Sequence, residues 1–140
     1  LYGLMELAPI LRRSNVKYEV IEHGPFENRW SERSNEEALK ELRERLIANP
    51  DAGTPIPGCG MLRKLRAADP SRGKGSRGGL RVIYLHTKEA KRIRLLTAYG
   101  KDEKEDLSAK ELKQWCAAAK RLRESDQEWA RKELAKAKNK

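Results

Sequence analysis

Three segments of the sequence carry side chains that could act together on a phosphate group. Residues 62–66 (LRKLR) place cations on both faces of a strand-like run, and residues 80–84 (LRVIY) bring a further arginine. Residues 97–101 (TAYGK) add a tyrosine and a lysine, with Lys104 just beyond. If these segments are neighbouring strands, one face or edge would gather the candidate catalytic residues Lys64, Arg66, Arg81, Tyr99, Lys101 and Lys104.

The chemistry open to such a group is metal-independent cleavage of RNA. A cationic cluster without paired histidines or clustered carboxylates disfavours Mg²⁺-dependent nuclease chemistry, so we predict no metal and no cofactor. Instead, a 2′-OH would attack the adjacent phosphate while guanidinium groups stabilise the added negative charge. A lysine can serve as the base where neighbouring cations depress its pKa. From the residues alone, a basic sheet that binds phosphates without cleaving them remains the more common outcome.

The net charge of the chain lies in one segment. Between Met61 and Lys101 there are twelve Lys/Arg residues, accompanied only by Asp69 and Glu89, which gives +10. Elsewhere 19 basic and 19 acidic residues cancel. Such a local positive field attracts polyanions, whose neutralisation releases counterions. The charge distribution therefore predicts nucleic acid as the leading partner.

Alternation and capping signals predict the elements that would hold these residues. Ser34–Glu37 and Ser108–Glu111 each read as a capping box that opens an amphipathic helix. We expect Ser125–Glu128 to break or re-cap the second of these helices. The predicted strands are 17–21, 61–67, 80–86 and 92–98, with a short helix at 26–33.

This order predicts a small α+β domain, in which the helices pack on one side of an antiparallel sheet. We divide the chain into an N-terminal extension or foreign segment (1–16), a folded domain (17–124) and a charged helical tail (125–140). Cys59 and Cys116 fit no metal-site spacing or disulfide framework, which predicts two reduced thiols in a cytoplasmic protein. The chain contains no apolar run long enough to span a membrane, so we expect no membrane association.

At these residues the sequence resembles the RelE/ParE toxin superfamily, and its later segments resemble the HigB-like branch. The resemblance extends from about Tyr18 to Arg123. The segments that carry it are Ile56-Pro57-Gly58, Leu62–Arg66, the loop Arg72–Gly79, Leu80–Tyr84, Leu95–Lys101, Glu103-Lys104 and Asp106-Leu107.

The resemblance implies a microbial RNase-type fold and a toxin that cleaves mRNA in the ribosomal A site. It also implies a cognate antitoxin, of the helix-turn-helix HigA type, through which alone the protein would reach operator DNA. By position, Lys64, Arg66 and Arg81 would bind and stabilise the scissile phosphate, with Lys64 a candidate base. Tyr99, Lys101 and Lys104 would lie in the remaining active-site segment. The residues expected to bind the RNA backbone are Arg63, Arg72, Lys74 and Arg77.

The sequence departs from the family at one position, and the family leaves two other functions open. Where RelE has an arginine after its Gly-Lys pair, a candidate general acid, this chain has Asp102. Tyr99, Lys101 or Lys104 would then have to supply the proton. Because ParE members of the superfamily poison DNA gyrase, a gyrase poison is one alternative function. A non-catalytic basic RNA-binding module is the other.

Overall fold

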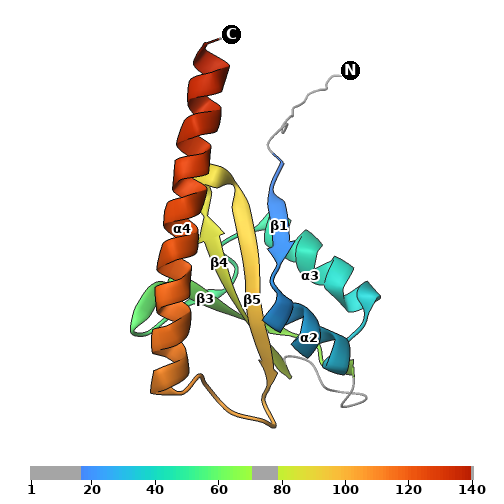
Figure 1. Cartoon of the computed structure of the whole chain (residues 1–140). Coiled ribbons are helices and arrows are strands. Elements are labelled where there is room, and N and C mark those ends of the chain that lie inside the picture. Colours follow the sequence, from blue (N-terminus) through green and yellow to red (C-terminus); the bar gives the residue numbers. More distant parts are fainter. Residues whose placement is uncertain (1–16, 71–78, 140) are drawn as a thin grey trace, which may run out of the picture.

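A computed structural model describes residues 17–70 and 79–139, which form one sheet with helices on both of its faces (Figure 1). The elements in chain order are β1 (Glu19–Glu22), α2 (Gly24–Arg33), α3 (Glu36–Ala48), β2 (Thr54–Ile56), β3 (Cys59–Ala67), β4 (Leu80–Thr87), the 3-10 turn η2 (Lys88–Ala90), β5 (Arg92–Gly100) and α4 (Ala109–Lys138). The α+β class and all four predicted strands are confirmed.

The five strands lie in the order β1-β5-β4-β3-β2. β2, β3, β4 and β5 pair antiparallel, whereas β1 runs parallel to β5. The expectation of a wholly antiparallel sheet is therefore wrong at this edge. It failed because β1 pairs with a strand distant in sequence, and no local pattern records that pairing. The sequence analysis also missed β2, a three-residue strand that contains Pro55.

Helices cover both faces of the sheet, which corrects the expectation of a single covered side. On β4, Val82 and Tyr84 pack with residues of α2 and α3, whereas Ile83 and Leu85 pack in a second cluster with residues of α4. Successive side chains of a strand point to opposite faces, so β4 must be apolar on both. The uninterrupted apolar run 82–85 carried this signal. In Figure 1, α4 crosses one side of the sheet, and α2 and α3 lie on the other.

The helix starts were predicted with mixed success. Ser108 caps α4 in a full capping box with Glu111, as expected. The box at Ser34 is wrong, because Asn35 is the N-cap of α3 and its side chain accepts a hydrogen bond from the Ala38 amide. Ser34 instead ends α2, where its backbone N–H donates to the Trp30 carbonyl.

α4 continues without a break through Ser125–Glu128, so the predicted interruption is wrong. Asp126 holds this part of the helix against the sheet. It is fully buried and accepts hydrogen bonds from Arg94 at 2.7 and 2.9 Å and from Arg92 at 2.9 Å. Burial acts against the charged carboxylate, but the two arginines outweigh it and lower the pKa of Asp126. The division of the chain into domains at 16 and 124 stays a prediction.

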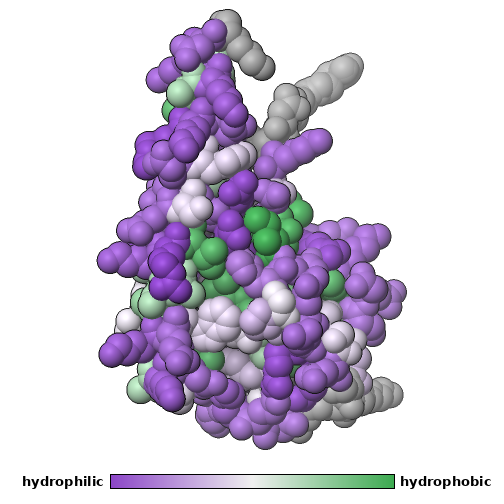
Figure 2. Space-filling model, in the orientation of Figure 1, coloured by the Kyte–Doolittle hydropathy of each residue, from purple (hydrophilic) through white to green (hydrophobic). Residues whose placement is uncertain are grey.

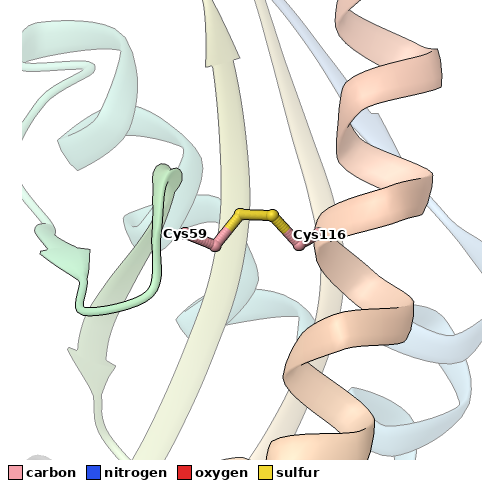
Figure 3. Close-up of a disulfide and its surroundings, with 2 residues drawn as sticks. All are labelled: Cys59 and Cys116. Carbon is pink, nitrogen blue, oxygen red and sulfur yellow. A yellow bond between two sulfur atoms is a disulfide. The ribbon is translucent and has the colours of Figure 1, made fainter.

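Cys59 and Cys116 form a disulfide, which corrects the expectation of two reduced thiols (Figure 3). The bond joins the first residue of β3 to α4 across 57 positions, with the Cα atoms 5.9 Å apart. Sequence spacing could not reveal it, because only the packing of α4 on the β2–β3 hairpin brings the two residues within bridging distance. The prediction of a cytoplasmic protein loses the support that it drew from reduced thiols.

The surface is predominantly hydrophilic on the side shown in Figure 2, with hydrophobic residues gathered near the middle of this face, between α4 and β1. Within residues 17–70 and 79–139, no helix is long and apolar enough to cross a membrane.

Candidate functional site

Strand register places three of the predicted site residues in one row across the sheet. Arg66 on β3 lies opposite Arg81 on β4, and Arg81 lies opposite Tyr99 on β5. Directly paired residues point to the same face, with Cβ atoms about 5 Å apart. Lys64 lies two residues before Arg66 and therefore shares that face. The central group predicted from the sequence is thus assembled by strand pairing.

This row lies on the face that α4 covers, next to the N-terminal end of that helix. A cavity of about 300 Å³ opens here, and Lys64, Tyr99 and Asp106 line it together with the apolar residues Ile56, Pro57, Leu107 and Leu112. Arg66 is exposed and Lys64 half-buried, whereas Arg81 and Tyr99 are only 7% and 3% exposed. The cavity is therefore lined by one half-buried cation, Lys64, and by the buried Tyr99, while Arg66 and Arg81 lie beside it in the row.

Tyr99 lines this cavity, and its hydroxyl is the tyrosine group that could donate a proton. Its hydroxyl is buried, and no described residue hydrogen-bonds to it. Burial, reinforced by the carboxylate of Asp106, raises the pKa of Tyr99 to about 12. The phenol therefore stays protonated at neutral pH. A buried hydroxyl without a partner is costly, which makes it a group that a bound ligand would satisfy.

Two carboxylates contact the cations of the site. Lys64 Nζ donates to Asp106 Oδ1 at 2.6 Å, and Lys104 Nζ donates to Glu111 Oε2 at the same distance. The Lys104 ammonium also lies 5.6 Å from the centroid of the Tyr99 ring. The sequence analysis missed Asp106 as a site residue. The acidic run that follows β5 was a signal in the sequence, but its spacing did not show which of its residues contacts β3.

Arg33 of α2 fixes the ends of β3 and β5 beside the row. Its guanidinium binds Asp69, which follows β3 and is fully buried, and Asp102 at 2.8 Å. A Cβ on Gly100 would collide with this guanidinium and with Asp102 Oδ1, so a larger residue there would force the ion pair to shift. The resemblance left open what Asp102 does in place of the family's arginine. In the structure, Asp102 forms an ion pair with Arg33.

The remaining predicted residues are less close to the row. Lys101 is exposed in the turn after β5, where its backbone N–H donates to the Gly79 carbonyl at 2.7 Å. Arg63 points to the opposite face and donates to the Gly53 carbonyl at 2.7 Å, in the connection after α3. Arg72, Lys74 and Arg77 lie outside the described residues.

Both histidines lie away from the row. His86 contacts Asp51 at 2.8 Å near the other end of β4, and His23 precedes α2 and contacts Arg94. Across residues 17–70 and 79–139, no three His, Cys, Asp or Glu side chains gather in a way that could hold a metal ion.

No family model matches the chain. Two solved structures to which it is similar come from E. coli. One is a chain of the intact RelBE toxin–antitoxin complex, at 15% identity and a TM-score of 0.46, covering 60% of this chain and 96% of that one. The other is the isolated RelE toxin, at 18% identity and a TM-score of 0.45, covering 76% of this chain and 99% of that one. The function proposed below therefore rests on the site residues and on their sequence motifs.

Proposed function

We propose that this protein is the toxin of a type II toxin–antitoxin pair, an endoribonuclease that cleaves mRNA in the ribosomal A site. The observation that carries the proposal is the row of Arg66, Arg81 and Tyr99 beside Lys64, next to a cavity of about 300 Å³. Lys64, Arg66 and Arg81 share one face of two neighbouring strands, and cations so placed would stabilise a phosphate whose negative charge grows during 2′-OH attack. The motifs that resemble the RelE superfamily supply the same residues in the same order.

In this proposal the strands hold the scissile phosphate and the cavity holds the neighbouring nucleotide. Arg66 and Lys64, which solvent reaches, would bind the incoming backbone, and the more buried Arg81 would stabilise the pentavalent phosphate. The Tyr99 hydroxyl would donate a proton to the departing 5′ oxygen. This assignment supplies the general acid that Asp102 cannot, because Asp102 is bound to Arg33.

The finer parts of the proposal follow the motifs. We place the protein in the HigB-like branch, with a HigA-type antitoxin as its partner and operator DNA reached only through that antitoxin. Arg72, Lys74 and Arg77, together with Lys101, would contact rRNA or mRNA backbone. Action on ribosomes requires a cytoplasmic location, where disulfides are uncommon.

Primer extension on cellular mRNA after induction tests the proposal. We expect new cuts within translated codons for the wild type. Because Arg66 is exposed, Arg66→Ala should leave the fold intact and still lower cleavage, by about 100-fold for a lost cationic stabiliser. Arg81→Ala should have a similar or larger effect. Arg121→Ala, which removes an exposed arginine from α4, is the matched control and should cut as the wild type does.

Two results would overturn this function. Growth arrest with intact mRNA, relieved by a resistant gyrase, would assign a gyrase poison. Salt-sensitive RNA binding without toxicity and without cleavage on ribosomes would assign a binding module.

A further inference from the structure

We propose that Asp106 is the general base of the reaction and removes the proton of the attacking 2′-OH. This inference rests on the endoribonuclease function proposed above and adds a residue to it. Neither the charge pattern nor the motifs assign Asp106 a role. Two observations place it in the site: it lines the cavity next to the row, and its carboxylate contacts Lys64 at 2.6 Å.

The surroundings of Asp106 suit a base. Its side chain is 70% exposed, so an RNA hydroxyl can reach it. Lys64, whose ammonium binds it, fixes the carboxylate at the edge of the phosphate-binding row. Tyr99 lines the same cavity, and its buried hydroxyl has no hydrogen-bond partner among the described residues, so a proton acceptor and a candidate proton donor belong to one site. Transfer to and from opposite ends of a phosphodiester needs such a pair. Among the described residues, the charged groups that contact or act on this pair are Lys64, Arg81, Lys104 and Glu111.

The proton and electron count closes with these two groups. Asp106 takes the proton from O2′, whose electron pair forms the new bond to phosphorus. The bond between phosphorus and O5′ breaks, and O5′ takes the proton of the Tyr99 hydroxyl. The products are a 2′,3′-cyclic phosphate and a free 5′-OH. Because the pKa of Tyr99 is about 12, the tyrosinate recovers a proton readily, and solvent removes the one left on Asp106.

Single-turnover cleavage of mRNA on programmed ribosomes, followed against pH, tests the base. We expect Asp106→Asn to slow cleavage at least 100-fold and to abolish the fall in rate at acidic pH. Asp106→Glu should restore part of the rate together with that fall. Glu105→Gln removes the same charge from the preceding exposed position and should behave as the wild type. The RNA affinity of each variant, measured separately, reports whether the site still assembles.

A modified substrate separates the base from the acid. An RNA with sulfur in place of the bridging 5′ oxygen releases a thiolate, which needs no proton donor. It should restore cleavage by Tyr99→Phe and leave Asp106→Asn slow. Rescue of both variants, an unchanged or faster rate for Asp106→Asn, or an acidic fall in rate retained by that variant would each overturn the assignment. Failure of the wild type to cleave would instead overturn the proposed function itself.

Discussion

Removal of the Cys59–Cys116 disulfide tests how α4 is held on the sheet. The bond closes a loop across 57 positions, and constraining an unfolded chain over that length is worth about 4 kcal/mol at 25 °C in the chain-entropy model. A domain of this size has a total stability of about 5–15 kcal/mol. Leu112, Trp115 and Ala119 still pack α4 on the sheet after reduction. We therefore expect a reduced protein that is folded but markedly weaker.

Urea unfolding, monitored by tryptophan fluorescence, measures how much stability the protein loses on reduction. With a denaturant slope of about 2 kcal/mol/M, the midpoint should fall by about 2 M when a dithiol reductant is added. The double variant Cys59→Ser/Cys116→Ser should show the lower midpoint with or without reductant. A midpoint shift below about 0.5 M would refute the reasoning, as would titration of two free thiols in the folded protein under oxidising conditions.

Three further perturbations test other parts of the fold. Asp126→Asn should cost about 3 kcal/mol at pH 7, because it removes the buried carboxylate that pairs with the half-buried Arg92 and Arg94. The folded pKa of Asp126 is lowered, so its contribution to stability is present above about pH 4 and is lost as the pH falls through the folded value. The difference in urea midpoint between the variant and the wild type should therefore shrink in acid. Gly100→Ala should lower stability and disturb the site because the new methyl group meets Arg33, which thermal unfolding and cleavage assays would show. Asn35→Ala should cost about 1 kcal/mol as a lost N-cap, whereas Ser34→Ala should cost little because the Ser34 hydroxyl has no hydrogen-bond partner among the described residues; equal losses in urea unfolding would contradict the observed helix start.

The row of site residues could be predicted because it depends on local patterns. The alternation around Lys64 and Arg66, and the run around Arg81, identify adjacent strands of a hairpin-rich sheet, and register then follows from the pleat. The position of Tyr99 could be predicted in the same way, from the strand pattern of residues 92–98. These strands are long and strongly patterned, and a short connection joins β4 to β5.

The features missed by the sequence analysis depend on contacts between distant segments. The disulfide, the pair Lys64–Asp106 and the anchor Asp126 each join α4, or the turn before it, to the sheet. From the sequence, an acidic residue beside a helix start can be explained without a role in the site, because its charge favours the helix dipole. Only the docking of α4 on the second face of β4 shows which acids face the strands, and that face was predicted to be uncovered.

The measurement that tests the central claim most directly is cleavage of ribosome-bound mRNA carrying one 2′-deoxynucleotide at the cleaved position. The proposed site activates a 2′-OH and stabilises the resulting phosphate, so the all-ribose mRNA should be cut to a 2′,3′-cyclic phosphate and the substituted one should resist. Equal cleavage of both mRNAs would contradict the account, because water and not the neighbouring hydroxyl would then be the nucleophile. An all-ribose mRNA left intact would contradict it as well.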